Sequence, residues 1–179
     1  SLYISIPFCP SKCRYCSFVS ATTPRLLALI PEYFEKLLCE ISDIAATVHS
    51  LGLTLSSVYV GGGTPAVLDA EQIARLLEKV YALFDMKDVE FTFEAGRPDC
   101  ITAEKLKALK SGGVTRISIN TQTANNEILA SVGRKHTFED YLNCMNLARD
   151  IGISCINTDL IAGLPGETEE SFRDSIQKV

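Results

Sequence analysis

The sequence predicts an α/β fold, a parallel (β/α) barrel that is only partly closed. Short runs rich in β-branched and aromatic residues alternate with longer amphipathic stretches along the 179 residues, which is the pattern of consecutive βα units. Five such units are predicted, and a closed barrel needs eight. A polar or glycine-rich segment follows each predicted strand, where parallel βα folds bind their ligands.

The first two βα units are marked by strand composition and by helix start signals. Residues 3–7 predict the first strand and residues 57–60 the second. A proline suits the first turn of a helix over residues 31–49. The next helix begins at Asp69, which forms a capping-box pattern with Gln72. Each helix carries an apolar stripe, formed by Phe34, Leu37, Leu38, Ile41, Ile44, Ala45 and Val48 in the first and by Ile73, Leu76, Leu77, Val80 and Phe84 in the second.

The later units follow the same order. Residues 89–94 predict the third strand, and its helix runs from Thr102 to a pair of glycines at 112–113, where glycine can adopt the left-handed turn that ends a helix. The other elements are expected as strands at 116–120 and 154–160 and as helices at 124–131, at 137–150 and from 168 onward.

One domain is expected over residues 1–179, because the length suits a single well-buried core. Strand sequence starts within the first three residues, and helical sequence continues to Val179. Domains usually begin and end in loose, polar residues. We therefore expect a core domain that is truncated at both ends and belongs to a longer protein.

Composition limits the class of partner. Hydrophobic residues make up 46% of the chain and charged residues 22%, with a net charge of −5, which is typical of globular domains and argues against nucleic-acid binding. No apolar run reaches membrane-spanning length, and no signal-peptide pattern is present. Of seven cysteines, an odd number, four are scattered. We expect Cys39, Cys100, Cys144 and Cys155 to be small buried hydrophobes in a cytoplasmic protein without disulfides.

The other three cysteines lie within eight residues, in a C-x3-C-x2-C run formed by Cys9, Cys13 and Cys16. Three thiolates on one loop can hold three irons of a four-iron cluster. The fourth iron then stays open to a ligand, as a catalytic metal site keeps one position free. The alternative is a structural zinc site, but zinc prefers a closed set of four ligands and only three lie nearby.

Polar residues at the other strand ends are candidates for a ligand site on the same face. A glycine run at 61–63 allows either a tight turn or the close approach of a ligand to the backbone. Glu94 and Asp159 interrupt apolar strands, and Asp159 suits hydrogen bonds from hydroxyl groups. Arg134 is either a solvated surface residue or a bidentate partner for a carboxylate. The two histidines, His49 and His136, are expected at the surface or at helix ends rather than as ligands.

Taken together, these motifs resemble those of radical S-adenosylmethionine (SAM) enzymes. The resemblance rests on the cysteine run, on Gly-Gly-Thr-Pro and on Gly-Leu-Pro-Gly-Glu, and it spans nearly the whole chain. The segment at 3–9 resembles the oxygen-independent coproporphyrinogen III oxidase group. The segments at 94–99, 117–120 and 134–137 resemble the HemZ branch of this group, the coproporphyrinogen dehydrogenase-like proteins.

The resemblance implies a [4Fe-4S] cluster and SAM as cofactors, with a role for each matching residue. The cluster ligands match Cys9, Cys13 and Cys16, and the residues lining cluster and SAM match Tyr3 and Tyr15. Further SAM contacts match Gly62, Gly63 and Thr64 at the methionine amino end, Glu94 and Arg134 around the methionine moiety, and Gln122 and Asp159 at the ribose. An acceptor and a donor suit a zwitterion, and an amide and a carboxylate suit hydroxyl groups.

The resemblance also implies an activity. Reductive cleavage of SAM yields methionine and a 5′-deoxyadenosyl radical, which takes a hydrogen atom from a propionate side chain of a tetrapyrrole. Loss of carbon dioxide and an electron then leaves a vinyl group, and in this way coproporphyrinogen III becomes protoporphyrinogen IX in haem biosynthesis. A flavodoxin or ferredoxin is the implied electron donor. Phe18 occupies a position where the best-established oxidases carry a fourth cysteine, and Thr121 replaces an expected proline. The Phe18 departure keeps a haem chaperone as the alternative, and a tRNA-modifying radical SAM enzyme is disfavoured by the acidic balance.

Overall fold

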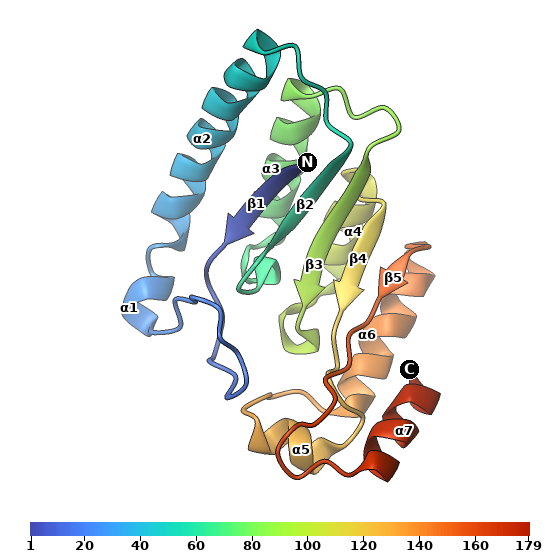
Figure 1. Ribbon diagram of the computed structural model, residues 1–179. Coiled ribbons are helices and arrows are strands. Elements are labelled where there is room, and N and C mark those ends of the chain that lie inside the picture. The colour runs from blue at the N-terminus through green and yellow to red at the C-terminus, as the bar shows by residue number, and fades with distance from the viewer.

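A single parallel sheet forms the centre of the computed structural model, which describes residues 1–179 (Figure 1). Its strand order follows the chain, β1-β2-β3-β4-β5, and every neighbouring pair is parallel. The strands are β1 (Leu2–Ile6), β2 (Ser57–Gly62), β3 (Glu90–Gly96), β4 (Arg116–Ile119) and β5 (Ile156–Asn157). Because β1 and β5 do not pair, the sheet is an open partial barrel, as predicted.

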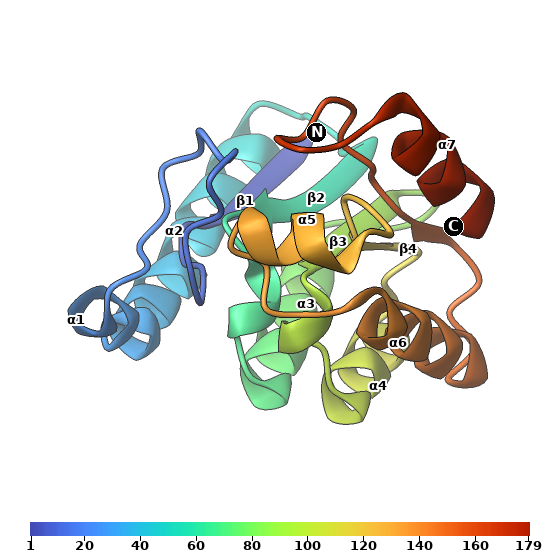
Figure 2. The same cartoon turned by 90° about the horizontal axis from the view of Figure 1, so that it is seen from below.

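Helices cover one face of this sheet. The helices are α1 (Pro24–Leu27), α2 (Ile30–Ser50), α3 (Ala70–Leu83), α4 (Ala103–Ser111), α5 (Asn126–Ser131), α6 (Phe138–Asp150) and α7 (Glu169–Lys178), with short 3-10 turns η1 (Pro65–Val67) and η2 (Pro98–Cys100). Figure 2 shows α2, α3, α4 and α6 on the same side of the sheet, while α5 crosses beyond the carboxyl ends of the strands. None of the helices is both long and apolar enough to cross a membrane.

The core lies between the sheet and these helices. Alternate strand residues such as Ile6, Val60 and Phe93 are fully buried there, because successive side chains of a strand point to opposite faces. They pack in one apolar cluster with the predicted helix stripes, including Phe34 and Leu76. The remaining strand residues, whose side chains point to the opposite, concave face, are therefore mainly polar or aromatic.

Local signals placed the helix starts correctly. The side chain of Asp69 accepts a hydrogen bond from the backbone N–H of Gln72 at 2.8 Å, and the Gln72 side chain accepts one from the backbone N–H of Asp69 at 3.1 Å, which completes the predicted capping box of α3. Thr102 and Thr168 cap α4 and α7. Gly113 follows α4 with φ of 81°, the left-handed turn expected there.

Some expectations about individual elements were wrong. The predicted strand at 154–160 shrinks to β5 plus one isolated bridge between Gln122 and Leu160. Here the Asp159 carboxylate accepts hydrogen bonds from the side-chain amides of Asn120 and Asn157, and the backbone N–H of Asp159 donates to the side-chain oxygen of Asn120, so side-chain bonds take the place of the regular ladder. A short helix, α1, also forms where none was predicted, with Thr23 as its cap.

The scattered cysteines are less buried than expected. Cys39 and Cys155 are exposed, and Cys100 and Cys144 are partly buried, although none forms a disulfide. Cys39 lies on α2, which covers the edge of the sheet beside β1 and therefore has a helix neighbour on one side only (Figure 2). For the same reason Ile44 of the predicted α2 stripe remains 42% exposed.

Candidate functional site

A pocket of about 270 Å³ opens at the carboxyl ends of the strands, and we call it the strand-end pocket. Its lining comes from the segments that follow all five strands. Every predicted site residue except Tyr3 takes part, namely Cys9, Cys13, Tyr15, Cys16, Gly62, Gly63, Thr64, Glu94, Gln122, Arg134 and Asp159. Residues from distant parts of the chain therefore meet at the face that the sequence indicated.

The glycine run packs directly against the cysteine loop. The Oγ1 of Thr64 lies 3.3 Å from the Sγ of Cys9, and the backbone N–H of Thr64 donates to the carbonyl of Phe8 at 2.8 Å. A Cβ on Gly63 would approach the same carbonyl to 2.6 Å and the Cys9 sulfur to 2.9 Å. Glycine is therefore required at 63, because any side chain would displace the cysteine loop.

The thiols suit a multi-iron cluster better than a single metal ion. All three are unpaired, with Cys9 and Cys13 buried and Cys16 partly exposed. The loop offers three cysteines, whereas a structural zinc site prefers a closed set of four ligands. Three thiolates on one loop at the edge of a pocket can hold three irons of a four-iron cluster.

Arg134 lines this pocket and carries an unsatisfied donor. Its Nε and Nη2 donate to the hydroxyl of Tyr15 at 3.0 Å and 2.8 Å, across 119 positions of sequence. Burial raises the pKa of Tyr15 to about 12, so the hydroxyl remains neutral. The Nη1 of Arg134 is buried without a partner. Since buried donors are nearly always paired, this atom fits an anionic ligand such as a carboxylate.

Glu94 places a carboxylate in the same pocket. Tyr59 donates a hydrogen bond to its Oε1 at 2.5 Å. Burial raises the pKa of Glu94, and the charge of Asp159 raises it further, although the hydrogen bond from Tyr59 opposes them. The register between β3 and β4 shifts between Glu94 and Gly96, a bulge that bends the strand at this point. A cationic ligand would stabilise the ionised form of this carboxylate.

Amide groups surround Asp159 on the other side of the pocket. The side-chain amides of Asn120 and Asn157 donate to its two carboxylate oxygens, each at 2.9 Å. Gln122 has φ of 75°, in the left-handed region that non-glycine residues seldom adopt. Its backbone is held there by hydrogen bonds with Asp159 and Ile161. Such backbone strain is common at ligand sites. The amide and carboxylate groups gathered here can donate hydrogen bonds to hydroxyl groups and accept hydrogen bonds from them.

Tyr3 lies outside the lining of the strand-end pocket. It is 59% exposed on the concave face and stacks on Tyr59, with ring centroids 5.8 Å apart. A Cβ on Gly61 would approach the Tyr3 hydroxyl to 3.0 Å and Glu94 Oε2 to 3.1 Å. Tyr3 therefore lies beside the Glu94 carboxylate, below the pocket, and its role at the cofactors stays a prediction.

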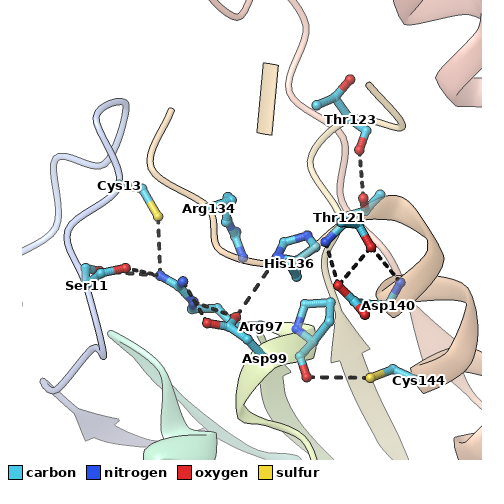
Figure 3. A network of polar contacts seen from close by, with 12 residues as sticks. Ser11, Cys13, Arg97, Asp99, Thr121, Thr123, Arg134, His136, Asp140 and Cys144 are labelled. Carbon is cyan, nitrogen blue, oxygen red and sulfur yellow. Dashed lines mark hydrogen bonds and ion pairs between the residues drawn. The ribbon is translucent and has the colours of Figure 1, made fainter. Parts of the chain in front are cut away.

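Sequence reasoning missed a buried polar cluster beside the cysteine loop, drawn in Figure 3. Arg97 is 3% exposed, and it pairs with Asp99. His136 lies at a helix end, as one of the two expectations had it, directly before the Thr137 cap of α6, but its side chain is fully buried 4.0 Å from Asp99. Burial, together with the Arg134 charge, lowers the pKa of His136 to about 4, so its ring is neutral. The sequence held one signal for this cluster, Arg97 beside Gly96 just after the third predicted strand.

Comparisons with known proteins agree with this arrangement. A family model described as the radical SAM superfamily matches residues 3–179. The oxygen-independent coproporphyrinogen-III oxidase-like protein HemZ of Bacillus subtilis is 41% identical over 180 residues, which are 99% of this chain and 36% of the relative. The heme chaperone HemW of Haemophilus influenzae is 37% identical over 183 residues, which are 99% of this chain and 47% of the relative.

The fold also matches a solved structure, coproporphyrinogen III oxidase (HemN) from Escherichia coli, described as a radical SAM enzyme. The TM-score is 0.87 at 34% identity, and the match covers 99% of this chain and 40% of that structure. The chain thus spans less than half the length of the relatives it matches.

Proposed function

The chain belongs to the radical SAM superfamily, whose members use a [4Fe-4S] cluster and SAM, and we propose that the strand-end pocket holds both cofactors. Cys9, Cys13 and Cys16 are the proposed cluster ligands. Their loop borders the pocket that contains Arg134 and Glu94, so an open iron and the groups for a second ligand would face each other. When bound, the pair supplies one-electron reductive cleavage of SAM.

The observation that carries the proposal is the pairing of an unsatisfied donor with a carboxylate in one pocket. Arg134 lines the pocket and carries the unpaired Nη1, and Glu94 contributes a carboxylate whose pKa is raised by burial. A zwitterionic amino acid moiety offers a carboxylate to the first and an ammonium to the second. The backbone at 62–64 would hold the amino end, and Gln122 with Asp159 the ribose hydroxyls.

For the longer protein we propose a finer function, the oxidative decarboxylation of coproporphyrinogen III to protoporphyrinogen IX. The similarity to HemZ of Bacillus subtilis and to the structure of coproporphyrinogen III oxidase from Escherichia coli supports this choice. A tetrapyrrole is the proposed substrate, and a flavodoxin or ferredoxin is the proposed electron donor. The residues of this chain contribute by positioning SAM and by keeping the polar groups of the pocket away from bulk water.

A haem chaperone is the second candidate, favoured by one position. Phe18 lies two residues after Cys16, where the resemblance to the oxidases expects a fourth cysteine, and it is 68% exposed. Relatives named heme chaperone HemW reach 37% and 38% identity. Such a protein would retain the strand-end pocket and its cofactors and would bind haem instead of oxidising a porphyrinogen.

The test uses the full-length protein that carries this sequence. After anaerobic reconstitution with iron and sulfide and reduction with dithionite, we expect 5′-deoxyadenosine to form from SAM. A full cluster without cleavage would contradict the proposed cofactor chemistry. In a second arm, added coproporphyrinogen III should yield protoporphyrinogen IX over many turnovers. Stoichiometric haem transfer without turnover would instead support the chaperone.

A further inference from the structure

A buried ion pair lies beside the cysteine loop and has no role in the pocket chemistry above. Arg97 follows β3 and is held by Asp99 through two parallel hydrogen bonds, Nε to Oδ1 and Nη2 to Oδ2, each 3.0 Å long. The side chains of Arg97 and Asp99 are 4% and 22% exposed. A bidentate pair in this setting fixes the plane and direction of the guanidinium.

The remaining nitrogen of Arg97 is directed at the cysteine loop. Its Nη1 donates to Ser11 Oγ at 2.9 Å and to the Ser11 carbonyl at 3.4 Å, and it lies 3.7 Å from the Sγ of Cys13 (Figure 3). Cys9 contacts a neutral hydroxyl, that of Thr64. Cys13 thus lies beside a permanent positive charge that comes from 84 positions away in the sequence.

We infer that Arg97 is a positioning residue that sets the reduction potential of the cluster through the Cys13 thiolate. The inference rests on the proposed function, because it requires a cluster on these cysteines. Hydrogen bonds to the sulfurs and nearby charge are among the factors that set the potentials of iron–sulfur clusters. A positive group close to the sulfur stabilises the reduced, more negative state and so raises the potential.

Asp99 does not cancel this effect, because the guanidinium lies between it and Cys13 (Figure 3). The pair is neutral as a whole, but its positive end faces the sulfur and its negative end faces away, toward His136. At short range the nearer charge dominates, since Coulomb energy falls with distance. Removing the charge of Arg97 should therefore lower the reduction potential, and removing the charge of Asp99 should raise it.

The experiment is a redox titration of the reconstituted full-length protein and its variants, followed by the EPR signal of the reduced cluster. Arg97→Gln should lower the potential, and at a fixed poise its ratio of reduced to oxidised cluster should fall about tenfold, equivalent to about 59 mV for one electron. Asp99→Asn keeps an acceptor for Arg97 and should raise the potential. Arg14→Gln, which removes an exposed charge next to Cys13, is the matched control and should leave it unchanged.

The outcomes separate this inference from the proposed function. If the wild-type protein takes up no cluster, both fail together. If all variants carry a full cluster with the same potential, or if Arg97→Gln and Asp99→Asn shift it in the same direction, only the inference fails, because a merely structural anchor would behave in that way. Should Arg97→Gln not fold, the double variant Arg97→Gln/Asp99→Asn removes both charges and must still show a lowered potential.

Discussion

On the helix-covered face of the sheet, Val60, Phe93 and Ile117 are fully buried within one apolar cluster. At the strand-end pocket and the polar cluster beside it, by contrast, Arg134 and His136 are buried with unpaired nitrogens, and Gln122 holds a left-handed backbone. Such features destabilise a fold. The burial of the apolar face therefore supplies the stability that offsets the cost of these unpaired polar groups at the pocket.

Cys13→Ala should produce the largest effect on function, because the proposed cluster would lose one of its three protein ligands. Iron content should fall, and 5′-deoxyadenosine should drop to background, while the unfolding free energy of the apoprotein changes little. Cys39→Ala is the matched control, since Cys39 is exposed on α2 and should retain both readouts. Equal iron and activity in both variants would sink the assignment of the ligands.

Phe93→Ala should produce the largest effect on stability, a loss of about 3–5 kcal/mol in unfolding free energy, because it opens a cavity in a close-packed core. Urea titration of the apoprotein measures this change. Phe18→Ala, at an exposed position, should stay within about 0.5 kcal/mol of the wild type. A small loss at Phe93 would show that the helix-covered face is not the main source of stability.

The pH dependence of stability should report His136. Its pKa is lowered from 6.5 to about 4 by burial, so between these values the unfolded chain binds a proton that the folded chain does not. Stability is therefore fully present above pH 6.5 and is lost as the pH falls, by about 3 kcal/mol at pH 4. In His136→Gln this part of the pH dependence should disappear, whereas His49→Gln should retain it. Identical pH profiles for all three proteins would refute the burial of a neutral imidazole.

Arg134→Met should weaken SAM binding by one to two orders of magnitude, about 2 kcal/mol, because a hydrogen bond to a charged group is lost. Equilibrium binding of SAM to the reconstituted protein measures it. Lys135→Met removes a neighbouring exposed charge and should bind SAM normally. If the two variants weaken binding equally, general charge attraction rather than the orphan Nη1 is responsible.

Asp69→Ala should give the smallest effect, a loss of about 1 kcal/mol in unfolding free energy through the α3 cap, with unchanged SAM cleavage. Asp69→Asn retains an acceptor and should lose less. Thermal unfolding of the two variants provides the measurement. A loss of cleavage in Asp69→Ala would show that the helix-covered face and the pocket are more tightly coupled than their separate contacts suggest.

The sequence determined the features that depend on near neighbours in the chain. The Asp69–Gln72 capping box, the helix starts at Thr102 and Thr168 and the glycine turn after α4 formed as predicted, because each depends on groups only a few residues apart. Consecutive βα units fixed the parallel order of strands. Since strand ends then share one edge, the site residues could be expected to gather there.

Only the tertiary structure decided burial and pairing at the pocket. Tyr15 meets Arg134 across 119 positions, and Arg97 reaches Cys13 across 84. The fold also buried His136 at its helix end, and it left Cys39 exposed, where burial was expected. The physical reason is that the burial and hydrogen-bonding partners of a side chain, and with them its pKa, depend on groups brought near by folding. Periodicity and capping patterns carry no information about such distant groups.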